Sequence, residues 1–85
     1  MKTTIEISNY PLNEDFETII LDFIERCKSS GLTTKVNATS THIQGDYEQV
    51  FEVLQKEIKH SFEKHGKMIF VVKILKGALD LDYNN

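Results

Sequence analysis

The 85-residue chain contains one cysteine, one proline and no tryptophan. A single cysteine cannot form an internal disulfide or a cysteine-based zinc site. No apolar run reaches the roughly 18–20 residues that a membrane-spanning helix needs, and the first residues, Met1 to Glu6, lack the apolar segment of a secretory signal. These absences predict a cytoplasmic protein with a single domain and no membrane partner.

Positive charge is also scarce. Ten Lys and Arg residues stand against 13 Asp and Glu residues, which gives a net charge of −3 without a basic cluster. Because neutralisation of phosphates drives nucleic-acid affinity, this balance argues against a nucleic-acid partner.

The hydrophobic fraction of 40% is sufficient for a core. At this length a chain buries only about 60–65% of its unfolded surface, so the core belongs to one small domain.

Hydrophobic periodicity predicts four strands and two helices. Ile5 and Ile7 alternate with polar residues, as in a half-buried strand that Pro11 ends. Asn13-Glu14-Asp15 predicts the start of the first helix, and Gln49 completes a capping box with Asp46 at the start of the second. The predicted elements are a strand over 3–10, a helix over 14–29, a hairpin of strands 33–38 and 41–44, a helix over 46–65 and a strand over 68–75.

The order of these elements, βαββαβ, predicts an α+β fold of the ferredoxin-like type. In this sandwich a four-stranded antiparallel sheet carries both helices on one face. The first and third strands are central, and the second and fourth form the edges. We expect residues 1–76 to form this single domain and residues 77–85 to form a polar C-terminal tail that frays at Asn84 and Asn85.

Strand alternation predicts which side chains face the helices and which lie on the open face. The expected helix-facing residues are Ile5, Ile7, Val36, Ile43, Phe70, Val72 and Ile74. The expected open-face residues are Glu6, Ser8, Tyr10, His42, Gln44, Ile69, Val71, Lys73 and Leu75. Large aliphatic residues on an open edge strand favour coverage by a second copy, so we expect a dimer or tetramer through the sheet face or edge. The alternative is a register shifted by one residue, which would turn Lys73 inward.

Few residues favour catalysis or metal binding. His60 and His65 do not share a helix face, and His42 lies on another element, so no metal site is expected. Cys27 falls in the apolar stripe of the first helix and is expected to pack as a small hydrophobic residue. No nucleophile has a base that the sequence identifies. We therefore expect neither an enzyme nor a cofactor.

A polar set on or beside the central strands is more informative. It comprises Glu6, Ser8, Tyr10, Thr39, Thr41, His42 and Gln44. A carboxylate, an amide and hydroxyls could bind a heterocycle that carries hydrogen-bond donors and acceptors, and Tyr10 could stack on its ring or face a cation. The alternative is an ordinary polar sheet face whose hydroxyls support turns.

Several short motifs in this order resemble the small thiamine-binding, YkoF-like protein family. They are Glu6-Ile7-Ser8-Asn9-Tyr10-Pro11-Leu12, Ser30-Gly31-Leu32, Thr41-His42-Ile43-Gln44-Gly45 and the glycine before the last strand. The resemblance spans residues 3–76. Gln44 replaces the glutamate that is usual in the family, and the last strand lacks the arginine and threonine often found there.

The resemblance implies a ferredoxin-like fold, association through sheets into dimers or tetramers, and non-catalytic binding of thiamine or its hydroxymethylpyrimidine moiety in thiamine salvage. It transfers binding roles to Ser8, Tyr10, Thr41 and Gln44; with Glu6 and Thr39, these are the candidate ligand-binding residues. Alternatives are a family member that has lost or changed its ligand and an amino-acid-binding regulatory module. An acylphosphatase-like enzyme ranks last, because acidic residues follow Pro11 where that activity needs an anion-binding loop.

Overall fold

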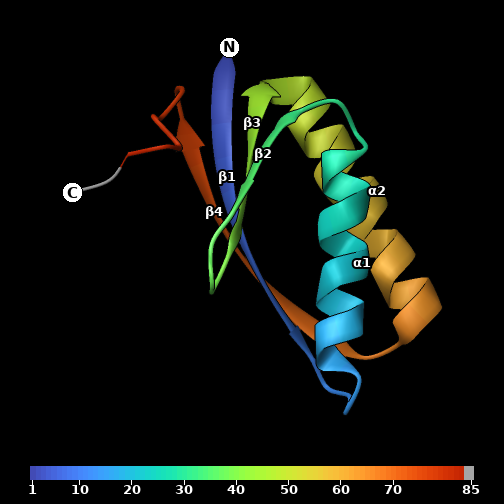
Figure 1. Cartoon of the computed structure of the whole chain (residues 1–85). Helices are drawn as coiled ribbons and strands as arrows, with labels where there is room; N and C mark the ends of the chain where they lie inside the picture. Colours follow the sequence, from blue (N-terminus) through green and yellow to red (C-terminus); the bar gives the residue numbers. More distant parts are fainter. Residues whose placement is uncertain (84–85) are drawn as a thin grey trace.

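The computed structural model describes residues 1–83 and confirms the βαββαβ order. The elements are β1 (Lys2–Pro11), α1 (Phe16–Lys28), β2 (Thr33–Val36), β3 (Thr41–Asp46), α2 (Tyr47–His65) and β4 (Met68–Lys76). The strands form one antiparallel sheet in the order β2-β3-β1-β4, so the first and third strands are central, as predicted. Both helices cover the same face of the sheet (Figure 1). The predicted fraying of Asn84 and Asn85 lies outside the described residues.

The register of β1 fixes the two faces of the sheet. Ile5 pairs with Ile43 on one side and with Ile74 on the other. Ile5 and Ile7 are 0% and 1% exposed under the helices, so Glu6 and Ser8 project from the opposite face. The predicted assignment of faces is confirmed, and a slip of one residue is excluded. On the edge strands, however, Val36 and Ile74 stay half exposed, because the helices cover mainly the middle of the sheet.

The core joins the sheet to both helices through aromatic and aliphatic contacts. The ring of Phe70 in β4 lies 5.0 Å from that of Phe23 in α1 and 5.7 Å from that of Phe62 in α2 (centroid distances). Cys27 is fully buried in the same core cluster as Phe23, as predicted, and burial raises the pKa of its thiol to about 12. No helix within residues 1–83 has the length and apolar character needed to cross a membrane.

The predicted helix starts differ from the structure. Asp46 precedes α2 but makes no capping hydrogen bond, so the predicted capping box is absent; its carboxylate pairs with Lys2 at 3.2 Å instead. Asn13 Oδ1 accepts a hydrogen bond from the Asp15 N–H in a turn, and α1 begins only at Phe16. A polar side chain that bonds to another group is not available to cap the helix.

Two neighbouring threonines on opposite faces of the sheet offer a matched test of what a buried hydroxyl contributes to stability. Thr3 is 1% exposed on the helix side, and its Oγ1 has no hydrogen-bond partner among residues 1–83. Thr4 is 3% exposed on the other side, where its hydroxyl donates to the Gly77 carbonyl and accepts from Gln44. We expect Thr3→Val to leave the free energy of unfolding unchanged or raised, and Thr4→Val to lower it by about 1–3 kcal/mol. Urea denaturation measures both, and a larger loss in Thr3→Val would contradict this account.

Candidate functional site

A row of charged side chains crosses the open face of the sheet. The register places one residue from each strand side by side: Lys35, His42, Glu6 and Lys73. Glu6 Oε2 lies 3.1 Å from His42 Nε2, and Glu6 Oε1 lies 3.5 Å from Lys73 Nζ. The side chain of Lys73 is 79% exposed, whereas that of His42 is only 20% exposed. The Glu6 carboxylate is therefore held by the largely buried His42 on one side, and on the other side it pairs with the solvent-exposed Lys73, which a ligand can replace.

A second polar group lies farther along β1. Ser8 Oγ donates a 3.2 Å hydrogen bond to the Thr39 carbonyl, in the turn between β2 and β3. Tyr10 lies two residues beyond Ser8 on the same face, opposite Ile69, and is half exposed. The Ser8 proton is thus directed at a carbonyl and not at a base. This arrangement suits binding and does not activate the serine as a nucleophile.

The candidate residues do not form one compact cluster. Gln44 pairs with Thr4, six residues before Tyr10 on β1, so about 20 Å of strand separates the two ends. One small ring cannot contact both. Thr41 lies on the other face, because it pairs with Ile7 and is 4% exposed under the helices. The structure thus brings Glu6 near Gln44 and Ser8 near Thr39 and Tyr10, and it separates Thr41 from them all.

The edge strand β4 gives this polar face an apolar border. Ile69, Val71 and Leu75 alternate along the open side of β4, and each is at least 42% exposed. Lys73 is the one charged residue between them. The open face therefore combines a polar centre with an uncovered hydrophobic margin.

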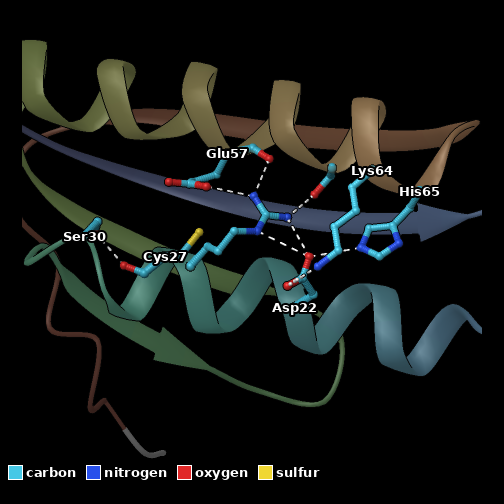
Figure 2. Close-up of polar contacts among 8 residues, drawn as sticks. Asp22, Cys27, Ser30, Glu57, Lys64 and His65 are labelled. Carbon is cyan, nitrogen blue, oxygen red and sulfur yellow. Dashed lines mark hydrogen bonds and ion pairs between the residues drawn. The ribbon is translucent and has the colours of Figure 1, made fainter.

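A separate polar network joins the two helices on the other side of the molecule (Figure 2). All five N–H donors of Arg26 find acceptors there: the Asp22 carboxylate, the Glu57 carbonyl and carboxylate, and the Ser61 hydroxyl. Glu57 is 7% exposed, so this ion pair is largely buried. Sequence reasoning missed the network, although Glu57 and Ser61 follow Val50 and Leu54 along the buried stripe of α2.

Asp22 connects this network to the end of α2. Its carboxylate lies 3.0 Å from His65 Nε2 and 3.5 Å from Lys64 Nζ. The hydrogen bond with His65 lowers the pKa of Asp22 below its usual 3.8; burial opposes this shift, and the charges of Arg26 and Lys64 add to it. Because the carboxylate is ionised, it is an acceptor, and His65 Nε2 must carry the proton.

The lowered pKa of Asp22 predicts a pH dependence of stability. A group whose pKa is lower in the folded state contributes stability that is fully present above its unfolded pKa, near 3.8, and is lost as the pH falls through the folded value. We expect Asp22→Asn to lower the free energy of unfolding by about 1–2 kcal/mol at pH 7. Below pH 4 the difference from the natural protein should shrink. Urea denaturation at several pH values tests this, and a difference independent of pH would contradict it.

A groove of about 610 Å³ lies beside the network, between the end of α1 and the middle of α2. Residues 29–32 form one wall, and α2 side chains including Glu52, Lys56 and His60 form the other. No group of three or more His, Cys, Asp or Glu side chains within residues 1–83 could hold a metal ion. The groove is the second candidate surface, but Arg26 and Glu57, which line it, already form an ion pair with each other.

Comparison with known proteins places this geometry in a family. The fold is shared with a candidate thiamine biosynthesis/salvage protein from Thermotoga maritima (TM-score 0.79, 21% identity, 87% of this chain and 82% of that one). It is also shared with a protein from Streptococcus pneumoniae (TM-score 0.86, 21% identity, 96% and 94%). A domain of unknown function from Bacillus cereus is similar too (TM-score 0.79, 19% identity, 96% and 85%).

At these identities the solved structures establish the fold alone. No protein with a curated description matches the chain. The model of the YKOF-related family, however, matches residues 2–77. This range includes the four strands and two helices described above and the row of charged side chains on the open face. The chain therefore belongs to the YKOF-related family.

Proposed function

We propose that this protein is a non-enzymatic binding protein for thiamine or its hydroxymethylpyrimidine moiety, which it holds on the open face of the sheet. Membership of the YKOF-related family and the fold shared with a candidate thiamine salvage protein support this ligand class. The observation that carries the proposal is the Glu6 carboxylate at the centre of that face, held by His42 and paired with an exposed lysine.

Glu6 suits a ligand that brings its own positive charge or amino group. A cationic ring or amine can take the place of Lys73 beside Glu6 Oε1, and a charge-assisted hydrogen bond then replaces a solvent-exposed ion pair. Two residues of strand, about 7 Å, separate Glu6 from Thr4 and its partner Gln44. One pyrimidine ring spans that distance. The two rings of thiamine reach further, toward Ser8 and Thr39, and Tyr10 offers an aromatic face beyond them.

We also propose that a second copy of the chain covers the apolar margin formed by Ile69, Val71 and Leu75. This margin lies on the edge strand β4, so a symmetric partner can pack on it without displacing the polar centre. Sedimentation should show a dimer or tetramer, and Val71→Lys should shift the protein toward monomer while far-UV circular dichroism stays unchanged. A monomer at all concentrations would refute the assembly.

Thermal denaturation with added compounds tests the ligand class. A ligand at 100 times its dissociation constant stabilises the folded state by about 2.7 kcal/mol, which raises the melting temperature of a domain this small by roughly 10 °C or more. We expect this shift with thiamine or hydroxymethylpyrimidine, and its loss in Ser8→Ala or Tyr10→Ala if thiamine is the ligand. A shift with amino acids alone would indicate a regulatory module, and no shift with either pyrimidine compound would refute the proposal.

A further inference from the structure

The chain beyond β4 turns back over the open face of the sheet (Figure 1). The Gly77 N–H donates to the Lys2 carbonyl at 2.7 Å, and the Gly77 carbonyl accepts the Thr4 hydroxyl at 2.9 Å. Farther on, Asp82 pairs with Lys35 at 2.9 Å. Residues 77–82, the C-terminal strap, therefore cross β1, β3 and β2 at one end of the face. Thr4 is almost fully buried on an otherwise open surface for this reason.

The strap also fixes the amide of Gln44. Gln44 Nε2 donates two hydrogen bonds of 2.9 Å, to Thr4 Oγ1 and to the Leu79 carbonyl. The only hydroxyl proton of Thr4 goes to Gly77, so toward Gln44 the Thr4 oxygen can only accept. The Leu79 carbonyl is an acceptor as well. A flipped amide would place Gln44 Oε1 against two acceptors, so the hydrogen-bond network permits one orientation.

This orientation uses both hydrogens of Nε2 and leaves Oε1 without a donor among residues 1–83. From this geometry we propose that Gln44 is a specificity-determining residue that the C-terminal strap locks as a hydrogen-bond acceptor. It selects a ligand with an N–H group at that point and rejects one with a carbonyl oxygen there. This inference rests on the proposed function, because it concerns the same face of the sheet.

The preference for an amino group follows from the donors and acceptors around Gln44. An amino group opposite Oε1 completes the set of bonds around Gln44. A ligand carbonyl at that place faces a lone pair, and Gln44 cannot turn over without breaking its bonds to Thr4 and Leu79. Sites built to bond a polar group discriminate strongly against an analogue that lacks it, because buried partners are then left unpaired. We therefore expect a preference of at least tenfold for the amino compound.

The test compares two probes, hydroxymethylpyrimidine with its exocyclic amino group and the analogue with a carbonyl oxygen in place of that group. Calorimetric titration of the natural chain should show the tenfold preference. A chain that ends at Gly77 lacks the bond to Leu79, so its preference should fall below about threefold. Asp82→Asn is the matched control: it removes only an exposed ion pair and should keep the preference. An unchanged preference in the shortened chain would overturn the inference.

A measurement without ligand separates failure of this inference from failure of the proposed function. In nuclear magnetic resonance spectra of the full chain, the side-chain amide protons of Gln44 should exchange with solvent at least tenfold more slowly than those of Gln49 and Gln55, which are exposed on α2. Equal rates in the full chain would overturn the locked orientation whether or not a pyrimidine binds. Slow exchange with no binding of either probe would uphold the locked amide, refute the proposed ligand and leave Gln44 without a selective role.

Discussion

Replacing Arg26 with methionine is expected to lower the free energy of unfolding by about 3–5 kcal/mol. The substitution keeps a long apolar side chain against Phe23, whose ring centroid lies 5.8 Å from the guanidinium carbon. It removes the Arg26 N–H groups that donate to the Glu57 carboxylate and the Ser61 hydroxyl. The Glu57 carboxylate, with a side chain 9% exposed, is then a buried charge without its partner. Urea denaturation at pH 7 measures the loss.

Two further variants separate the buried ion pair from a general effect of charge. Lys28→Met removes a positive charge from the same helix, where its 3.9 Å contact with Glu25 is exposed, and should change stability by less than about 0.5 kcal/mol. The double variant Arg26→Met/Glu57→Leu should recover most of the loss, because replacing both partners by apolar groups leaves no unpaired charge. A double variant as unstable as Arg26→Met would contradict this explanation.

Glu6→Gln should weaken the binding of hydroxymethylpyrimidine or thiamine by about tenfold to a hundredfold, the worth of one hydrogen bond to a charged group. Glutamine keeps the size of Glu6 but removes the charge and one of the two acceptor oxygens that face His42 and Lys73. Isothermal titration calorimetry measures the affinity. The fold should be little affected, because the pair with Lys73 is exposed and the glutamine oxygen can still accept a hydrogen bond from His42.

Glu63→Gln is the matched control for this loss. Glu63 lies exposed on α2, on the helix layer, and its replacement changes the net charge by the same amount. It should bind both compounds as the natural chain does. Equal affinities for Glu6→Gln and the natural chain would show that the carboxylate does not contact the ligand.

The fold was predictable because its signals are local and periodic. The alternation at Ile5 and Ile7 set the helix-facing side of β1, and the register with Ile43 and Ile74 agrees with it. The helix starts were less predictable for two reasons. Asp46 pairs with Lys2, a partner that only the tertiary structure supplies, and Asn13 accepts the Asp15 N–H in a local turn that precedes the helix. Lys2, which pairs with Asp46, lies 44 residues away from it in the sequence.

The candidate site was predictable in its residue types and less so in its arrangement. Alternation placed Glu6, Ser8 and Gln44 on one face. The same alternation puts Thr41 with Ile43 on the other face, and only the family resemblance gave Thr41 a binding role. The strap over Gln44 left no sequence signal, because its contacts with Thr4 and Gln44 are made by backbone carbonyls that any residue carries. The network around Arg26 depends on the packing of α1 against α2, which a pattern within one helix does not report.

The most direct test of the open face as the binding surface is a titration of the isotopically labelled protein with hydroxymethylpyrimidine, followed by backbone amide shifts. The account predicts that the shifts cluster at residues 4–8 of β1 and 42–44 of β3, with residues 49–57 of α2 unchanged. Shifts centred on the groove between α1 and α2, at residues 29–32 and 49–57, with β1 unmoved, would contradict it.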